Sequence, residues 1–334
     1  MRLNVLSNEN TDFEIEVNHK IAPFEVEIDP TNTCNQDCYY CNVHDFRKDF
    51  PDKASTEDYV NLIRGLPDTV GKIVFSGGGE PTVHKDASIL IEEACKKNAE
   101  VGLITNGTML YRLNLSENNR PDWMGIDIDA VNDEDYYKIR KHKFKYVLKN
   151  VKEEVPKIKK YGTKLTFKYL ITDYNNTWEH FTEAIDFAVE HGFDEFFARI
   201  AHFKDGHVIE PITDWDDVHN KLDIYCKGKK IVFLSAFAKE KDFRNTTEPI
   251  EKCFGPMLSV IFCADGYTYW CTEHRGVPEY RLGNWIKDGY NSIFKKGLLK
   301  EMDNFRDCHS CSLQCKYFYL KNRDGSWKGI NIDA

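Results

Sequence analysis

Apolar and acidic residues alternate between Phe24 and Asp29, which predicts a β-strand with one apolar face. The strand leads directly into the loop Cys34-Asn35-Gln36-Asp37-Cys38-Tyr39-Tyr40-Cys41. We therefore expect three cysteines at the C-terminal end of a strand. Functional sites form at these ends in barrels of alternating strands and helices.

Strand and helix patterns continue to alternate along the next 170 or so residues, as parallel strand–helix units do. The predicted strands after the first cover 72–75, 101–105, 123–129, 164–171 and 195–200. Apolar residues at three-and-four spacing predict helices around 56–65, 87–95 and 178–188, and further helical stretches extend through Lys160. One more helix and one more strand follow, near 215–226 and 230–234. The pattern predicts an α/β fold, a partial (β/α)6 TIM barrel.

The C-terminal region has a different pattern. Ser259 to Cys263 and Tyr267 to Cys271 flank an Asp-Gly turn, which predicts a β-hairpin. Six cysteines between Cys253 and Cys315 indicate a second, separate metal site, so we expect a small C-terminal β-hairpin/helix module that binds metal. The predicted domains are an N-terminal extension at 1–21, the barrel at 22–236 and the C-terminal domain at 237–334.

Composition narrows the class of protein. No run of 18 apolar residues occurs and the first twenty residues hold no hydrophobic segment, so we expect no membrane span, no signal peptide and a cytoplasmic location. The net charge of −9 argues against a nucleic-acid surface. The lysine-rich stretch from Lys138 to Lys168 is the exception, interpreted as a solvated helix face or a local site for an acidic substrate.

The chain has eleven cysteines, and in a reducing compartment these favour metal binding over disulfides. Cys95 and Cys226 stand alone within helix patterns and are expected to pack in the core. Cys34, Cys38 and Cys41 can hold three irons of a cubane cluster and leave the fourth open to another ligand. A zinc site completed by His44, or a redox dithiol, is the alternative.

Three motifs in this order resemble the radical S-adenosylmethionine (SAM) enzymes over residues 22–200. They are Cys34-xxx-Cys38-xx-Cys41, Gly78-Gly79-Glu80-Pro81 and Thr105-Asn106-Gly107, each after a predicted strand. The resemblance implies a [4Fe–4S] cluster on the three cysteines, with SAM on the fourth iron. It also implies that reduction cleaves SAM to a 5′-deoxyadenosyl radical, which abstracts a hydrogen atom from the substrate.

The same resemblance suggests SAM-binding residues. Gly77, Gly78 and Gly79 would allow close approach to the methionine end of SAM, and Glu80 would accept from its amino group. Further predicted contacts come from Tyr40 beside the adenine, and from Asn106, Asp127, Arg140 and Arg199. Asp127 stands where the family often has serine, which departs from the pattern. Arg140 and Arg199 would bind the SAM carboxylate or the substrate, with a surface ion pair as the alternative.

The C-terminal cysteines resemble the auxiliary-cluster extensions called SPASM and Twitch. The match consists of Cys253, Gly266 and Cys271 at the shared spacing, then Cys308-xx-Cys311. Cys315 follows four residues after Cys311, where full SPASM has a gap of six. The resemblance favours one auxiliary [4Fe–4S] cluster on Cys253, Cys271, Cys308 and Cys311, in which Cys263 or Cys315 could replace one ligand. Structural zinc is the alternative.

We therefore predict a radical SAM oxidoreductase that dehydrogenates a small polyol, amino-sugar or sugar-nucleotide, with the auxiliary cluster as electron acceptor. A flavodoxin- or ferredoxin-type protein would supply the activating electron. Arg199, His202 and His207 are candidate proton acceptors. Peptide or protein modification is the second hypothesis, and Cys263 or Cys315 would be the hydrogen donor of an epimerase. A non-catalytic iron–sulfur electron carrier is the third.

Overall fold

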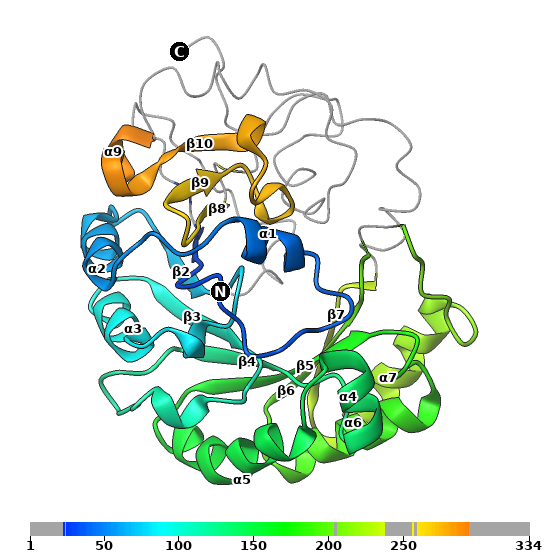
Figure 1. The fold of residues 1–334 in the computed structure, drawn as a ribbon. Helices are drawn as coiled ribbons and strands as arrows, with labels where there is room; N and C mark the ends of the chain where they lie inside the picture. Colours follow the sequence, from blue (N-terminus) through cyan, green and yellow to red (C-terminus); the bar gives the residue numbers. More distant parts are fainter. Residues whose placement is uncertain (1–22, 24, 204–205, 238–255, 257–258, 294–334) are drawn as a thin grey trace, which may run out of the picture.

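The computed structural model describes residue 23 and residues 25–203, 206–237, 256 and 259–293. Within them, one continuous sheet has the order β10-β9-β8-β1-β2-β3-β4-β5-β6-β7 (Figure 1). The strands are β1 (Glu25–Ile28), β2 (Lys72–Phe75), β3 (Glu100–Thr105), β4 (Trp123–Asp127), β5 (Lys164–Ile171), β6 (Glu195–Ile200), β7 (Val232–Ser235), β8 (Ser259–Phe262), β9 (Tyr267–Tyr269) and β10 (Arg281–Asn284). The strands from β8 through β1 to β7 are parallel, and the three strands β8, β9 and β10 form an antiparallel edge.

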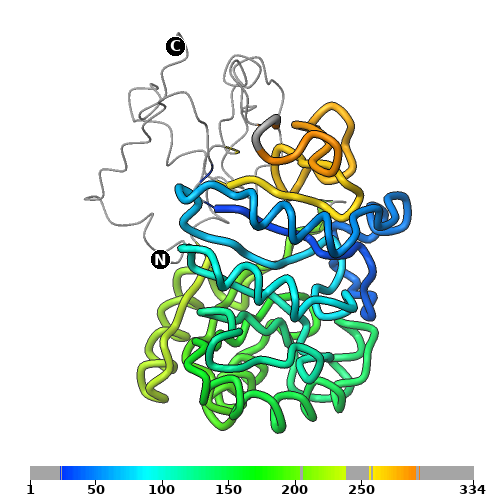
Figure 2. The backbone as a smooth tube through the Cα atoms, turned by 90° about the vertical axis from the view of Figure 1, so that its left-hand side faces the viewer, coloured from blue at the N-terminus to red at the C-terminus, as the bar shows by residue number. Residues whose placement is uncertain are grey.

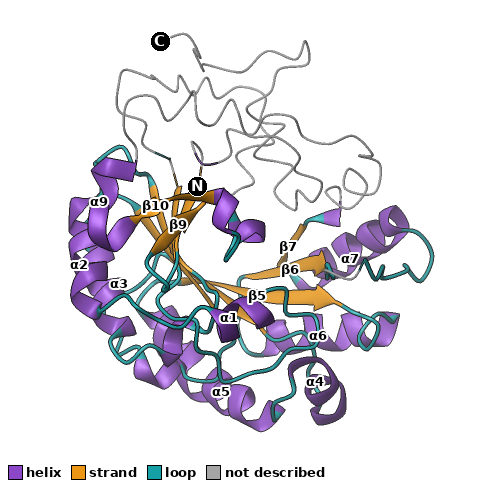
Figure 3. Ribbon diagram, turned by 45° about the horizontal axis from the view of Figure 1, so that its top comes forward, coloured by secondary structure: helices purple, strands orange, loops and turns teal. Residues whose placement is uncertain are grey.

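Helices cover the outer side of this curved sheet, and the loop between β1 and α1 crosses its inner side (Figures 1 and 3). The helices are α1 (His44–Asp49), α2 (Thr56–Gly65), α3 (Ala87–Cys95), α4 (Asp133–Arg140), α5 (Phe144–Lys160), α6 (Trp178–Glu190), α7 (Trp215–Lys229) and α9 (Trp285–Ile293). A partial barrel of alternating strands and helices is confirmed. No helix within the described ranges combines the length and apolar character that crossing a bilayer requires.

Local sequence explains where the helices begin and end. Ser55 and Asp58 form a capping box at the start of α2, and Thr177 caps α6 through the His180 amide. Gly192 ends α6 with a φ of +76°, a backbone conformation that glycine adopts without strain. The predicted stop of this helix is confirmed.

The alternation in β1 separates two faces of the sheet. Val26 and Ile28 are fully buried against the outer helices, in a core that also includes Leu62 of α2 and Leu90 of α3. The intervening Glu27 faces the inner side of the sheet. The apolar face of the strand is buried against the helices, and the other face is polar. The inner side of the sheet therefore has charged groups from which a site can be formed.

The predicted hairpin forms, but it is joined to the barrel. β8 pairs with β1 in parallel, from Glu25 opposite Ser259 to Ile28 opposite Phe262. Figure 2 shows this segment (yellow and orange) lying directly against the first strands (blue). The described part of residues 237–334 therefore continues the barrel sheet.

Candidate active site

The three-cysteine loop lies between β1 and α1 and is fixed to the end of α4 by backbone hydrogen bonds. The Asp37 amide donates to the Arg140 carbonyl at 3.3 Å, and the Tyr39 amide to the Ile139 carbonyl at 3.1 Å. The Cys41 amide donates to the Cys38 carbonyl at 3.0 Å and closes a turn. These hydrogen bonds fix the backbone of the loop against the C-terminal end of α4.

The three thiols form an electrostatic group. Burial raises the pKa of Cys34, and raises the pKa of Cys38 to about 12. Negative charge on Cys41 raises the pKa of Cys34, and negative charge on Cys34 or Cys41 raises the pKa of Cys38. Arg140 lowers the pKa of Cys38, whose sulfur accepts a hydrogen bond from Arg140 Nη1 at 3.8 Å. The raised pKa values of Cys34 and Cys38 favour neutral thiols, so a bound cationic metal centre would be needed to hold these sulfurs as thiolates.

Three thiols in one short loop are a donor set that fits a cubane cluster. Among the described residues, no three His, Cys, Asp or Glu side chains converge in the manner of ligands to one metal ion. Cubane ligands need not converge, because each thiolate binds a different iron. His44, the predicted fourth zinc ligand, pairs instead with Asp37 at 3.0 Å. The residues present fit an iron–sulfur cluster on Cys34, Cys38 and Cys41.

The Gly-Gly-Glu-Pro segment after β2 packs against the backbone that precedes Cys34. The Gly79 amide donates to the Thr31 carbonyl and the Glu80 amide to the Thr33 carbonyl, both at 2.9 Å. A Cβ atom on Gly79 would lie 2.2 Å from the Thr33 carbonyl oxygen, so only glycine fits. Gly77 and Gly78 are similarly close to protein atoms. In this structure the glycines allow two loops to meet, and their contact with SAM stays a prediction.

The buried Glu80 carboxylate accepts four hydrogen bonds from the protein. Oε1 accepts from the Thr82 amide at 3.0 Å and from the hydroxyls of Thr82 and Thr105, each at 2.6 Å. Oε2 accepts from the Asn106 amide at 2.7 Å. Burial raises the pKa of Glu80, and these donors lower it in part. Glu80 thus joins the loop after β2 to the loop after β3, and its predicted contact with SAM is untested.

Asn106 continues this network into the cysteine loop. Its Nδ2 donates to Asn35 Oδ1 at 2.9 Å, and Asn35 Nδ2 donates to the Thr108 hydroxyl at 2.7 Å. Asn35 directly follows Cys34 in the chain. The three sequence motifs therefore meet at one end of the sheet, through Asn35, Glu80 and Asn106.

A buried ion pair organises the other side of the loop. Arg140 Nη2 lies 2.6 Å from Asp129 Oδ2, and the same oxygen accepts from the Tyr40 hydroxyl at 2.7 Å. The Arg140 guanidinium lies 5.6 Å from the centre of the Tyr40 ring. Tyr40 and Arg140, both predicted to contact SAM, are thus engaged with Asp129.

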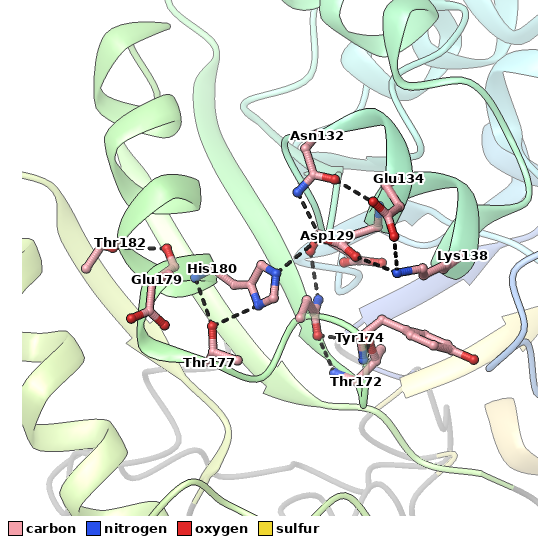
Figure 4. A network of polar contacts seen from close by, with 12 residues as sticks. Asp129, Asn132, Glu134, Lys138, Thr172, Tyr174, Thr177, Glu179, His180 and Thr182 are labelled. Carbon is pink, nitrogen blue, oxygen red and sulfur yellow. Dashed lines mark hydrogen bonds and ion pairs between the residues drawn. The ribbon is translucent and has the colours of Figure 1, made fainter.

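Asp129 was missed by the sequence analysis, which considered only Asp127 in this segment. It has a φ of +65°, and its Oδ1 accepts from the Leu170 amide at 2.8 Å. Figure 4 shows how the polar groups around it come from the end of β4, from α4, from the loop after β5 and from the start of α6. The signal that could have identified Asp129 is its place as an acidic residue at the C-terminal end of the predicted strand 123–129, where barrel sites form.

Asp127, Lys168 and Arg199 come from neighbouring strands β4, β5 and β6. Asp127 stands opposite Lys168 in the sheet register, and their charged groups lie 3.1 Å apart. Arg199 is opposite Leu170, two residues beyond Lys168 on the same face, and has no hydrogen-bond or ion-pair partner among the described residues. An aspartate beside the carboxylate of SAM would be unfavourable, and the pairing of Asp127 with Lys168 reduces that repulsion.

A second buried charge cluster joins β1 to the C-terminal region. Arg275 donates from Nε to Asp29 at 2.7 Å and from Nη2 to Glu27 at 2.9 Å. The fully buried Cys263 donates from its thiol to Asp29 at 3.5 Å, and burial raises its pKa well above the usual range. Arg275 was not predicted, because its partners are 246 and 248 residues away and no local pattern links them.

The remaining predicted site residues lie elsewhere. Cys271 is half-buried at the end of the hairpin, and Cys253, Cys308, Cys311 and Cys315 lie outside the described residues. His207 is paired with Asp173 at 2.7 Å. Cys226 is fully buried in the hydrophobic core, and the partly buried Cys95 packs against this core, as expected.

Curated relatives match part of the chain. An S-adenosylmethionine-dependent nucleotide dehydratase of Selenomonas ruminantium is 27% identical over 114 residues, which are 33% of this chain and 40% of the relative. The antilisterial bacteriocin subtilosin biosynthesis protein AlbA of Bacillus subtilis is 28% identical over 138 residues, 39% of this chain and 30% of the relative. The chain thus matches well under half the length of these relatives.

Solved structures share the fold over most of the chain. SuiB of Streptococcus suis bound to precursor peptide SuiA is 15% identical, with a TM-score of 0.67 over 86% of this chain and 68% of that one. The enzyme anSMEcpe with bound AdoMet is 17% identical, with a TM-score of 0.56 over 84% and 82%. Residues 28–188 match the model of the radical SAM superfamily. With its motifs gathered at the end of a partial barrel, residues 28–188 form a radical SAM domain, and that family uses a [4Fe–4S] cluster and SAM.

Proposed function

We propose that this radical SAM enzyme dehydrogenates a small substrate that carries an anionic group, with a sugar-nucleotide as the leading class. A polyol or amino-sugar belongs to the same predicted group but lacks a phosphate. The dehydrogenation removes one hydrogen atom, one electron and one proton from the substrate. An auxiliary cluster held in part by Cys271 is the proposed electron acceptor.

The observation that carries the substrate class is the pair of cations on the inner face of β5 and β6. Arg199 is without an anionic partner among the described residues, and Lys168 has one carboxylate, Asp127, at 3.1 Å. An unpaired guanidinium inside a barrel favours binding of a phosphate or carboxylate, because its forked donors match these groups. A neutral polyol would leave this charge uncompensated.

The protein's own residues have defined tasks in this proposal. Cys34, Cys38 and Cys41 hold the cluster, and Arg140 donates to the Cys38 sulfur. Glu80, Asn106 and Asn35 keep the motif loops in register around it. With cluster and SAM bound, the site supplies radical chemistry that abstracts a hydrogen atom from the substrate. Arg199 and Lys168 orient the anionic end of that substrate.

Peptide modification is the second candidate. AlbA is named for biosynthesis of a bacteriocin, and SuiB was solved with a precursor peptide. An acidic peptide would also satisfy Arg199. The two candidates differ in the size of the substrate, and a substrate screen separates them.

The test measures iron, sulfide and 5′-deoxyadenosine on anaerobically reconstituted protein with SAM and dithionite, and then turnover of sugar-nucleotides, polyols and peptides. We expect Arg199→Met to raise the KM for the substrate at least about tenfold, because a charge-assisted hydrogen bond is lost. Its Kd for SAM should stay unchanged, and Arg199→Lys should recover part of the loss. A parallel loss of SAM affinity would assign Arg199 to SAM and remove the argument for an anionic substrate.

The auxiliary cluster needs its own variant. Cys271→Ala should leave uncoupled SAM cleavage intact and stop product formation, whereas Cys38→Ala should abolish both. Normal turnover by Cys271→Ala would refute the electron-acceptor role. Turnover of peptides alone would favour the second candidate.

A further inference from the structure

A basic and aromatic surface surrounds the start of α5, outside the barrel. Its exposed lysines are Lys141, Lys143, Lys145 and Lys149, and the exposed Tyr146 lies among them. None of these four lysines has a carboxylate at ion-pair distance in the part of the chain that the structure describes. We call these five residues the α5 basic surface.

Helix stability explains Lys141, which is the C-cap of α4, but it does not explain Lys143 and Lys145. The first turn of α5 has no acidic residue and contains Lys145, while Lys143 is the N-cap. The positive end of a helix dipole disfavours cations there. The neighbouring α4 follows the favourable pattern, with Asp133, Glu134 and Asp135 in its first turn. The cations at the start of α5 therefore lower the stability of the helix. Attraction of an anionic partner is a functional reason for keeping them there.

The α5 basic surface is connected to the three-cysteine loop. Asn150 of α5 donates from Nδ2 to the Thr108 carbonyl at 2.7 Å, and the Thr108 hydroxyl accepts from Asn35. An open cavity of about 580 Å³ lies at the same place, between Asn35 on one side and Tyr146 and Lys149 on the other. Because Asn35 is the residue after Cys34, a partner seated here would be next to the loop that holds the first cluster.

Exposed aromatic side chains complete the surface. Tyr111 and Tyr146 both line the cavity and are 61% and 46% exposed. Tyrosine is enriched at the centre of protein interfaces, where it provides a large contact area at low entropic cost. His142 and Met109 lie beside them, and Glu153 is the acidic residue that lines the cavity. The composition suits a protein partner rather than a small anion.

We propose that the α5 basic surface is the docking site for an acidic one-electron carrier protein of the flavodoxin or ferredoxin class. The carrier loses one electron and the cluster on Cys34, Cys38 and Cys41 gains it, with no bond made or broken. The chain has a net charge of −9, so its overall field repels an acidic carrier, and the lysines of the α5 basic surface provide a local attraction. The difference in charge between the α5 basic surface and the chain as a whole favours the orientation in which the carrier lies next to the cluster. The inference rests on the family's cluster and is independent of the substrate.

The test compares two double variants on the same helix. Lys145→Glu with Lys149→Glu changes the surface, and Lys157→Glu with Lys160→Glu makes the same change in charge about 12 Å or more farther along α5. The holoenzyme of each is titrated with oxidised flavodoxin and with ferredoxin at low and high salt. Cluster reduction by the reduced carrier is followed by stopped-flow absorbance, and 5′-deoxyadenosine formation with dithionite is the reference.

We expect the surface variant to weaken carrier binding and slow cluster reduction at least about tenfold at low salt, with the difference shrinking at high salt. The distal variant should change each by less than about twofold, and dithionite should support equal 5′-deoxyadenosine formation in all three proteins. Equal effects of the two variants, or no effect of either, would overturn the docking site. Tighter binding of an acidic oligonucleotide than of the carriers would also overturn it. A wild-type protein that binds carrier through this surface but turns over no anionic substrate would reject only the proposed function.

Discussion

Glu80 is central to the site at the residue scale, because its carboxylate is the shared acceptor for donors on two loops. Glu80→Ala leaves four donors without an acceptor: the amides of Thr82 and Asn106 and the hydroxyls of Thr82 and Thr105. We expect the free energy of unfolding to fall by roughly 2–4 kcal/mol, since unsatisfied buried donors are costly. Urea denaturation of the apoprotein measures this loss.

The shape-conserving Glu80→Gln variant serves as the control. It keeps one carbonyl oxygen for the donors and should retain part of the stability and of the SAM affinity. SAM affinity should fall together with stability if Glu80 acts by positioning the loops. A variant that keeps its stability and still loses SAM affinity would indicate instead that the Glu80 carboxylate contacts SAM directly.

At the scale of elements, substitutions in α5 measure how much the lysines at its N-terminus lower the free energy of unfolding. Lys145→Glu places an anion in the first turn, near the positive end of the helix dipole, and should raise the free energy of unfolding by about 0.3–1 kcal/mol. Lys157→Glu should lower it by a similar amount, because it puts an anion in the last turn and breaks the pair with Glu154. Thermal unfolding at low salt distinguishes the two. A destabilised Lys145→Glu would mean that this lysine supports the fold, which would weaken the argument for a docking role.

Some elements could be predicted from their own sequence, whereas others depend on contacts with distant parts of the chain. β2, β5, β6 and α2 were predicted with the observed bounds, because the pattern of apolar residues that defines each of them lies within the element itself. The short α1 was not anticipated, nor was β10, whose pairing with β9 is interrupted by a register shift. The same limit applies to the site. The cysteine, glycine and asparagine motifs could be found from their spacing, but the partners Asp129 and Arg275 are defined by contacts between distant segments.

At the scale of the whole molecule, the C-terminal strands and the barrel should unfold as one unit. β8 extends the barrel sheet through four paired residues of β1, and Arg275 adds buried ion pairs to Asp29 and Glu27. We expect amide hydrogens in β8 and β9 to exchange with the same free energy of opening as those in β2 and β3. Exchange of the C-terminal strands at a distinctly lower free energy would support an independent domain at 237–334.

The Arg275→Met variant tests which interactions hold the C-terminal strands β8 and β9 to the barrel. Removing the guanidinium leaves two carboxylates close together without their counter-charge, and breaking such a buried pair costs about 3–5 kcal/mol. We expect a single transition at lower denaturant concentration, with opening of β8 and β9 favoured over opening of β2 and β3. Adding Glu27→Gln and Asp29→Asn to Arg275→Met should recover much of the stability, because no uncompensated charge then remains. If the triple variant were no more stable than Arg275→Met, the loss would come from packing around the Arg275 side chain rather than from charge. The C-terminal strands would then be held to the barrel mainly by the β1–β8 ladder.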